Sequence, residues 1–272
     1  VMLNKKISKN IENISKRKLS IQFSLDGFSF CIANAANTIY HFSSFSFDRE
    51  NTTPESLLDE VEKIFKNDQD LQSDFDSVEV VHENRLNSFV PNEYFREEHL
   101  KSYLNYNVKN IVTDYATFDS FEALDFKNVY IPYVNINNFL FQNFGTFEYK
   151  HHASVLLEKL MIKAQKQSTH FFVHVNSSSF DIVVIENQKL LYFNAFEYQI
   201  KEDFIYYILF AFEQLKLNPE ELKLIFIGEI TEDSELYQIA YKYIRNIDFI
   251  TASSTILEGK EMENHANFIL LG

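Results

Sequence analysis

A run of small polar residues is the part of the chain best suited to holding an anion: Asn176, Ser177, Ser178 and Ser179. One amide and three hydroxyl groups in succession can donate hydrogen bonds to a phosphate group. The same composition is typical of a polar turn that joins two strands and binds nothing. Both interpretations stay open at the level of the sequence, and the plain turn is the commoner one.

Glycine-rich phosphate loops are excluded by the positions of the glycines. The chain has five glycines, and no two of them lie closer than 13 positions apart. Phosphate loops need glycine because the backbone must approach the phosphate oxygens without a Cβ atom in the way. The P-loop and the dinucleotide-binding glycine pattern are therefore both absent.

Metal-binding and hydrolytic patterns are equally hard to find. His170 and His174 share one face of a predicted strand, about 13 Å apart at roughly 3.3 Å per residue. One zinc ion with bonds of about 2 Å cannot bridge that distance. A nucleophile elbow of the GxSxG kind is absent. The acid pair Asp114 and Asp119 is typical of a surface segment, and nothing around it favours general acid–base chemistry.

The bulk composition indicates the compartment and excludes one class of partner. The single cysteine, Cys31, cannot form an internal disulfide and suits a reducing compartment. No apolar run approaches 18 residues, and no apolar leader opens the chain. We therefore expect a cytoplasmic protein without stable membrane insertion. A net charge of −14 repels phosphate backbones, so nucleic acid is not an expected partner.

Charge is unevenly distributed along the chain. Residues 1–18 contain six basic residues and one acid, whereas residues 54–80 contain nine acids and two lysines. Leu3, Ile7, Ile11 and Ile14 recur at helical spacing within this basic arm. That spacing is compatible with an amphipathic helix on a membrane or on an acidic partner. An arm that is solvated, or that folds onto the acidic body of its own chain, is the commoner outcome.

Patterns of apolar residues predict the secondary structure. Alternation indicates a hairpin over residues 19–33 with Asp26 and Gly27 in its turn, followed by a strand at 38–47. A helix is expected from Pro54 to about Lys66. Residues 170–198 predict three strands joined by short turns. Further strands are expected at 77–82, 129–134, 222–227, 247–251 and 268–271, and further helices at 92–104, 135–143, 150–165, 202–215 and 233–243.

The same order of elements occurs twice. A common offset of 152 positions relates Phe28 to Phe180, Phe30 to Ile182, Ile32 to Val184 and Tyr40 to Tyr192. An even offset preserves the face of the sheet on which each side chain lies. We infer an α/β fold class with a duplicated βββαβαβ unit and a cleft between the halves. The expected parts are a basic arm at 1–18, a first lobe at 19–150 and a second lobe at 151–272.

Four segments carry a resemblance to a known fold: SIQFSLDGFSFCI, LNSFVPNEYF, NVYIPYVN and KHHASVLLEKL. Over about residues 19–272 the chain resembles the actin-like ATPase (ribonuclease H-like) superfold. Within it, the chain is most similar to an uncharacterised bacterial family. The cytoplasmic actin-like proteins of pilus assembly and type II secretion are more distant likenesses. The resemblance implies two lobes, each opening with a hairpin whose turn faces the cleft.

The resemblance also implies which residues would meet a nucleotide. In catalytic members, an aspartate of the first hairpin holds magnesium through water, and the N–H groups of the turn hold phosphate. Here either Ser24 stands at the position of that acid, or Asp26 is the acid and Phe28 brings a bulky ring towards the phosphate. Asp26 and Gly27 are therefore candidate cleft residues that match the catalytic pattern poorly.

The two remaining nucleotide motifs depart from the catalytic pattern as well. The second hairpin normally offers an acid and then mostly glycine, but His174 replaces the acid here and no glycine follows. Catalytic relatives have a glycine pair after the strand at 222–227, whereas Gly228 is followed by Glu229, which repels phosphate. The implied cleft candidates are Asp26, Gly27, Asn176, Ser177, Ser178, Ser179 and Gly228, with no catalytic residue, cofactor or metal assigned.

Three functions are compatible with these observations. We favour a non-catalytic binding or scaffold protein with a protein partner, because the fold repeats while all three nucleotide motifs are degenerate. The first alternative is a divergent ATP- or phosphate-binding protein, a slow ATPase or kinase, that uses Asp26, Ser177, Ser178 and Gly228. The second is an adaptor that holds a peptide of a membrane-associated machine, on the basic arm or in a groove bordered by Tyr40, Phe42, Phe45 and Phe47.

Overall fold

The computed structural model describes residues 2–8, 16–48, 52–105, 115–251 and 265–271. The chain divides into two compact units. The described residues of the first unit lie within 2–155, and those of the second are 156–251 and 265–271. The division falls inside α4 (His152–Lys163), a few residues beyond the lobe boundary expected at 150. In the described part of the chain, no helix is long and apolar enough to cross a membrane.

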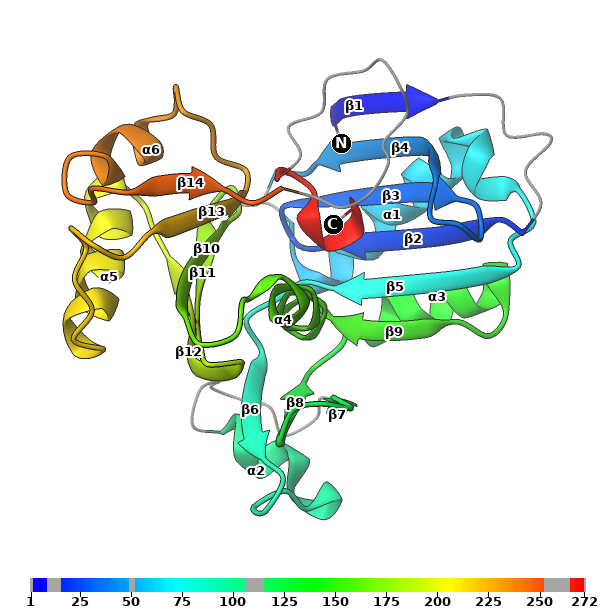
Figure 1. Cartoon of the computed structure of the whole chain (residues 1–272). Helices are drawn as coiled ribbons and strands as arrows, with labels where there is room; N and C mark the ends of the chain where they lie inside the picture. The colour runs from blue at the N-terminus through cyan, green and yellow to red at the C-terminus, as the bar shows by residue number, and fades with distance from the viewer. Residues whose placement is uncertain (1, 9–15, 49–51, 106–114, 252–264, 272) are drawn as a thin grey trace. The chain divides into compact units, whose positions relative to one another are not determined.

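A six-stranded sheet forms the centre of the first unit, in the order β1-β4-β3-β2-β5-β9 (Figure 1). Its strands are β1 (Met2–Ser8), β2 (Lys18–Phe23), β3 (Gly27–Ala33), β4 (Ile39–Ser46), β5 (Ser77–His82) and β9 (Glu148–His151). Strands β2, β3 and β4 form an antiparallel meander, whereas β5 pairs parallel with β2 and β9 pairs parallel with β5. Parallel neighbours need crossover connections, and α1 (Pro54–Asn67) and α3 (Val134–Phe144) lie in these.

Helices α1 and α3 lie side by side on one face of this sheet (Figure 1). Helix α1 begins at a capping box, in which the Ser56 N–H donates to Thr53 Oγ1 at 3.2 Å and the Thr53 N–H donates to Ser56 Oγ at 2.8 Å. Its apolar stripe packs onto strands β2, β3 and β5 through Leu57, Val61, Ile64 and Phe65. Burial of that stripe holds the helix against the sheet.

A small three-stranded sheet lies in the sequence between β5 and α3. It has the order β6-β8-β7, from β6 (Asn87–Pro91), β7 (Thr117–Ser120) and β8 (Phe126–Tyr130). Its own small core includes Leu104 of the short helix α2 (Leu100–Leu104). The helix predicted at 92–104 is wrong over its first half, because Tyr94 N–H and Phe95 N–H donate back to Pro91 O and Asn92 O and close a turn. The strand expected at 129–134 ends at Tyr130 instead.

The second unit is built around a five-stranded sheet in the order β12-β11-β10-β13-β14. Its strands are β10 (Thr169–Val175), β11 (Ser179–Glu186), β12 (Lys189–Glu197), β13 (Leu224–Gly228) and β14 (Ile247–Phe249). Helices α5 (Lys201–Gln214) and α6 (Glu235–Ala240) bury apolar residues against it, Phe204 and Ala240 among them. The last strand expected, at 268–271, is wrong, because this segment is the short helix α7 (Phe268–Leu271), in which Leu271 N–H donates to Asn267 O.

The duplication expected from the 152-residue offset is confirmed. Strands β4-β3-β2-β5-β9 and β12-β11-β10-β13-β14 have the same order and the same directions. The two hairpin turns are closed by matching hydrogen bonds: Ser24 N–H donates to Gly27 O at 2.9 Å, and Asn176 N–H donates to Ser179 O at 2.8 Å. Both units are therefore βββαβαβ modules. The offset of 152 relates β2 and β3 to β10 and β11, but the equivalence of Tyr40 and Tyr192 is wrong: Ile32 pairs with His41 and Val184 pairs with Tyr192, so the third strands are related by 151 positions.

The basic arm is partly a strand of the first sheet. Strand β1 pairs antiparallel with β4, so the helical interpretation is wrong for residues 2–8, while 9–15 lie outside the described residues. The edge of β4 offers unpaired backbone groups, and a segment that pairs there satisfies them. Lys6 Nζ lies 3.0 Å from Asp68 Oδ2 and 3.4 Å from Asp70 Oδ2, within the acidic segment. This part of the arm therefore folds onto the acidic body of its own chain.

Candidate functional site

The first hairpin turn places Asp26 and Gly27 at one end of the sheet of the first unit. Asp26 N–H donates to Ser24 Oγ at 3.1 Å, and Asp26 O accepts from Phe47 N–H at 2.8 Å. A Cβ atom on Gly27 would lie 2.5 Å from Phe45 O, so the turn requires glycine for close packing of β3 on β4. The backbone N–H and C=O groups of Asp26 are thus already used in hydrogen bonds within the first unit.

Phe28 does not crowd the turn, contrary to the expectation from the sequence. Its ring is 1 % exposed and packs in the core of the first unit against Phe30 and Phe65. It is the first core residue of β3 after the turn, and the register with β2 points it inward opposite Phe23. The poor match to the catalytic pattern therefore rests on Ser24 and Asp26, not on the bulk of Phe28.

The second unit brings the other predicted residues together. The turn formed by residues 176–179 follows Val175, and Val175 pairs with Gly228 across the parallel strands β10 and β13. The Tyr198 hydroxyl lies 2.8 Å from Asn176 O and 3.1 Å from Ser177 O, and Tyr198 N–H donates to Ser178 O. Asn176, Ser177, Ser178, Ser179 and Gly228 therefore form one polar patch, whereas Asp26 and Gly27 belong to the other unit.

The backbone conformation and the close packing at position 228 both require glycine. Its φ is +90°, and a Cβ atom there would overlap Val175 O. Its N–H donates to His265 O at 2.9 Å, so this backbone donor is already used within the unit. The next residue, Glu229, is exposed and carries a negative charge beside the patch. The Gly228 N–H is therefore not available to an anion, and the neighbouring Glu229 is unfavourable for one.

His174, which stands where the resemblance leads us to expect an acid, is buried with a partner. It is 4 % exposed and lies directly opposite Asp181 in the hairpin, with its Nδ1 atom 3.1 Å from Asp181 Oδ2. His170 has a different partner, Ser168 Oγ at 2.7 Å from its Nε2 atom. The sequence shows both members of the His174–Asp181 pair, but only the register of the hairpin makes them neighbours.

Asp119 is not the surface acid that its sequence surroundings indicate. It is 7 % exposed, with its Oδ2 atom accepting from His151 N–H at 2.9 Å and its Oδ1 atom accepting from the Tyr130 hydroxyl at 3.1 Å. Burial raises the pKa of its carboxyl to about 6, although these hydrogen bonds oppose the shift. Asp114 lies outside the described residues. The Asp119 carboxyl serves as a buried polar link between β7 and β9.

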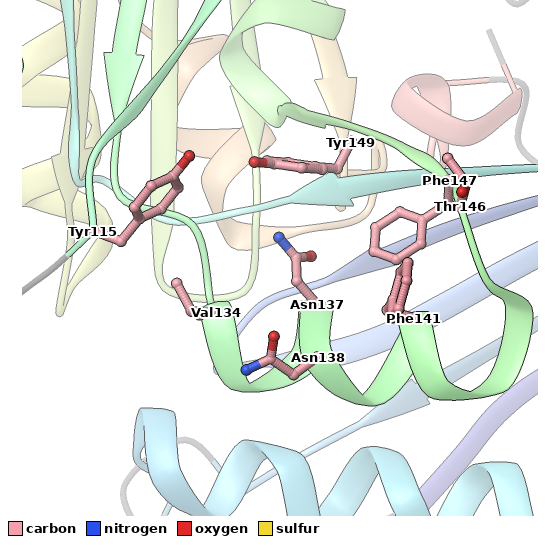
Figure 2. A pocket seen from close by; sticks show the side chains of 8 residues that line it. All are labelled: Tyr115, Val134, Asn137, Asn138, Phe141, Thr146, Phe147 and Tyr149. Carbon is pink, nitrogen blue, oxygen red and sulfur yellow. The ribbon is translucent and has the colours of Figure 1, made fainter.

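An aromatic pocket of about 350 Å³ opens on the first unit, between α3 and the segment that leads into β9 (Figure 2). It is lined by Tyr115, Val134, Asn137, Asn138, Phe141, Thr146, Phe147 and Tyr149. None of these side chains is charged. Phe141 and Tyr115 are 60 % and 57 % exposed, so the aromatic surface is open to solvent. We name this feature the aromatic pocket.

The floor of the aromatic pocket is held in place by hydrogen bonds. Asn137 Oδ1 accepts from His82 Nε2 at 2.9 Å, because His82 Nδ1 already accepts from Tyr133 N–H. The hydroxyl groups of Tyr115 and Tyr149 are turned towards each other (Figure 2), and burial together with Tyr115 raises the pKa of Tyr149. The pocket thus presents a preformed apolar surface with amide and hydroxyl groups at its edges.

The alternative in which Tyr40, Phe42, Phe45 and Phe47 border a peptide groove is wrong for two of these rings. Phe42 and Phe47, expected to border it with Tyr40 and Phe45, are 1 % and 9 % exposed and form part of the buried core of the first unit. The aromatic pocket is instead assembled from α3, from residues 146–149 that follow it, and from Tyr115, which precedes β7. The sequence feature that could have indicated this pocket is the pair of aromatic residues on either side of Gly145, Phe141 and Phe147, at the end of α3.

Among solved structures, a Bacteroides thetaiotaomicron protein with an actin-like ATPase fold and unknown function is similar over 89% of this chain and 94% of its own, with a TM-score of 0.78 and 23% identity. The PilM–PilN type IV pilus biogenesis complex is similar over 86% of this chain and 88% of its own, with a TM-score of 0.53 and 10% identity. The cytoplasmic domain of EpsL, an inner membrane component of the type II secretion system of Vibrio cholerae, reaches a TM-score of 0.41 at 13% identity over 84% of this chain and 94% of its own.

None of the curated proteins matches the sequence. The likeness to the Bacteroides thetaiotaomicron structure confirms the actin-like ATPase fold that the sequence resemblance implied. Residues 6–247 match the family described as "Protein of unknown function (DUF3822)". Because that match covers most of the chain, the protein belongs to the DUF3822 family and has the actin-like ATPase fold.

Proposed function

We propose that this protein is a non-catalytic binding protein of the cytoplasm that uses the aromatic pocket to hold a segment of a partner protein. The observation that carries the proposal is the pocket itself: open, preformed, aromatic and uncharged. Exposed aromatic side chains around a concave surface are typical of sites that anchor a partner's apolar side chains. The net charge of the chain is −14, yet none of the eight residues that line the pocket is charged.

The hairpin turns support the non-catalytic part of the proposal. Nucleotide hydrolysis needs a metal-holding acid and free backbone donors for phosphate. In the second unit, His174 is buried against Asp181, and the Gly228 N–H donates to His265 O. In the first unit, Asp26 N–H is bonded to Ser24 Oγ. The His174 ring, the Gly228 N–H and the Asp26 N–H are thus engaged in holding the fold.

The fold relatives supply a second line of support. PilM is found in a complex with PilN in type IV pilus biogenesis, so the fold of that protein serves in a protein–protein assembly. An adaptor role for this chain, in which a peptide of a membrane-associated machine occupies the aromatic pocket, is the more specific form of the proposal. The alternative function, a divergent ATP- or phosphate-binding protein, rests on a different observation. It is the serine-rich turn at residues 176–179, which lies beside Gly228.

The proposal is tested by affinity capture from the native cell with matched variants. Phe141→Ala removes a 60 % exposed ring of the pocket, and Phe210→Ala removes a 40 % exposed ring of α5 in the second unit. We expect a partner that is retained by the wild type and by Phe210→Ala, and that binds purified Phe141→Ala at least about tenfold more weakly, as the loss of an aromatic anchor predicts. Equal affinity of the partner for all three proteins would refute a binding role for the pocket.

A further inference from the structure

His41, Asp68 and Asp70 gather their ligand atoms in one place in the first unit. The histidine comes from β4, Asp68 lies between α1 and the short helix η1 (Gln69–Gln72), and Asp70 lies within η1. One imidazole nitrogen and one oxygen from each carboxylate all lie within 4.8 Å of one another. Nitrogen and carboxylate oxygen together are the donor set that suits zinc and neighbouring divalent ions.

The His41 ring is rigidly held with one nitrogen directed at this cluster. The ring is 0 % exposed, stacks on Phe30 with 5.0 Å between ring centroids, and bonds through Nε2 with Ser43 Oγ at 2.9 Å. Its Nδ1 atom lies 3.1 Å from Asp70 Oδ2, yet this contact lacks hydrogen-bond geometry and Nδ1 is buried with no hydrogen-bond partner. A buried, unpartnered nitrogen is costly unless something else occupies its lone pair.

The spacing of His41 Nδ1 and Asp70 Oδ2 fits coordination of both atoms to a single ion. Two adjacent ligands held about 2.0–2.1 Å from one metal ion lie about 2.8–3.4 Å apart in tetrahedral or octahedral geometry. The 3.1 Å between His41 Nδ1 and Asp70 Oδ2 falls within that interval. Asp68 is held as well, because its Oδ1 atom accepts from Asp70 N–H at 3.1 Å while Oδ2 is directed at the cluster. The side chains of His41 and Asp68 are therefore held in position by hydrogen bonds.

A cation from the chain itself lies beside the cluster. Lys6 of β1 has its Nζ atom 3.0 Å from Asp68 Oδ2 and 3.4 Å from Asp70 Oδ2. Its side chain is 40 % exposed, and β1 is an edge strand that pairs with β4. An exposed ammonium group on an edge strand can leave at low cost. Lys6 Nζ contacts the two acids, and His41 Nδ1 is still without a hydrogen-bond partner.

We propose that His41, Asp68 and Asp70 form a binding site for a divalent transition-metal ion such as Zn²⁺, and that the Lys6 ammonium is the displaceable cation at this site. The ion takes one nitrogen and two oxygen ligands from the chain, and water completes its coordination. Binding releases Lys6 from the two acids. The site is independent of the aromatic pocket and of the hairpin turns.

The test is a calorimetric titration of the full-length chain with Zn²⁺ alone, repeated with Co²⁺ for its visible absorption. Asp70→Asn removes one ligand charge at a side chain that is 24 % exposed, so this variant is expected to fold. Asp74→Asn removes the same charge from an exposed position of the same segment, and His99→Ala removes an exposed histidine. Lys6→Met removes the competing ammonium while keeping a similar apolar stem.

We expect one zinc ion per chain in the wild type and in both controls, at least about tenfold weaker binding in Asp70→Asn, and about tenfold tighter binding in Lys6→Met. The visible bands of bound Co²⁺ should diminish in Asp70→Asn and persist in the controls. The proposal is overturned if neither the wild type nor Lys6→Met binds zinc, if Asp70→Asn binds it like the wild type, or if His99→Ala abolishes the binding. Unchanged affinity in Lys6→Met would refute the role given to Lys6.

Discussion

Glu83 and Glu229 make the same backbone hydrogen bond in the two units: Glu83 N–H donates to Phe23 O at 3.0 Å, and Glu229 N–H donates to Val175 O at 2.7 Å. Each glutamate directly follows the parallel strand that neighbours the hairpin, β5 in one unit and β13 in the other. The duplication therefore places a carboxylate next to both hairpin turns. Two such charges oppose the binding of a polyanion at either turn.

We expect Mg·ATP to show no micromolar binding in a calorimetric titration. The N–H groups of Asp26 and Gly228 are already hydrogen-bonded within the protein, and each hairpin turn has a glutamate beside it. Asp26→Asn should leave this result unchanged, because the proposed non-catalytic function gives Asp26 no role in holding a metal ion. Micromolar binding by the wild type would contradict the non-catalytic proposal. Loss of that binding in Asp26→Asn would then establish the ATP-binding alternative.

The His174–Asp181 pair is predicted to stabilise the second unit. Asp181→Ala removes the charged partner of a histidine that is 4 % exposed, and such a loss costs about 1–3 kcal/mol of unfolding free energy. Asp233→Ala, at an exposed position of the same unit, should change it by no more than about 0.5 kcal/mol. Urea unfolding followed by circular dichroism measures both. Equal stability of the two variants would show that the pair contributes nothing.

Gly228→Ala should be far more destabilising than Gly145→Ala. Both glycines have positive φ, +90° and +73°, but a Cβ atom on Gly228 would overlap Val175 O, whereas nothing lies within 4 Å of one on Gly145. We expect about 1 kcal/mol for Gly145→Ala, from the backbone conformation alone. For Gly228→Ala we expect about 3 kcal/mol or more, because the clash with β10 is added. Similar unfolding midpoints for the two variants would contradict this prediction.

Protonation of His82 should destabilise the protein in acid. Burial lowers the pKa of this ring to about 3, despite its hydrogen bond to Asn137, whereas an unfolded chain has a histidine pKa of about 6.5. The unfolded state therefore binds the proton first, and stability is lost as the pH falls from about 6.5 towards 3. Between pH 7.5 and 4 the wild type should lose about 3 kcal/mol relative to His82→Gln.

The comparison with His82→Gln isolates this effect from that of Asp119. The raised pKa of Asp119 acts in the opposite direction, because the folded state takes up its proton as the pH falls below about 6. Asp119 is present in both proteins, so its contribution cancels in the difference. A difference in unfolding free energy that does not vary with pH would show that His82 titrates normally in the folded protein.

Local patterns were enough to predict much of the fold. The Asp26-Gly27 turn, the strand at 77–82 and the helix that begins at Pro54 follow from alternation, turn chemistry and capping, which involve residues near each other in the chain. The 152-residue offset predicted the duplication because equal spacing preserves the register of the first two strands of each unit, β2 and β3 with β10 and β11. The degenerate nucleotide motifs were visible as residue types without any coordinates.

Other features depended on partners that are distant in the sequence. Leu3 and Ile7 have helical spacing, yet the open edge of β4 makes their segment a strand. Phe28 is inward because of its register with β2, and His174 meets Asp181 because their strands pair. Tyr115, Phe141 and Tyr149 form a pocket, and Lys6 meets Asp68 and Asp70, only after the chain has folded. The amino-acid sequence determined the modules and their missing phosphate motifs, because these depend on short-range order. Tertiary structure alone decided which side chains share a site, because that depends on contacts between segments far apart in the chain.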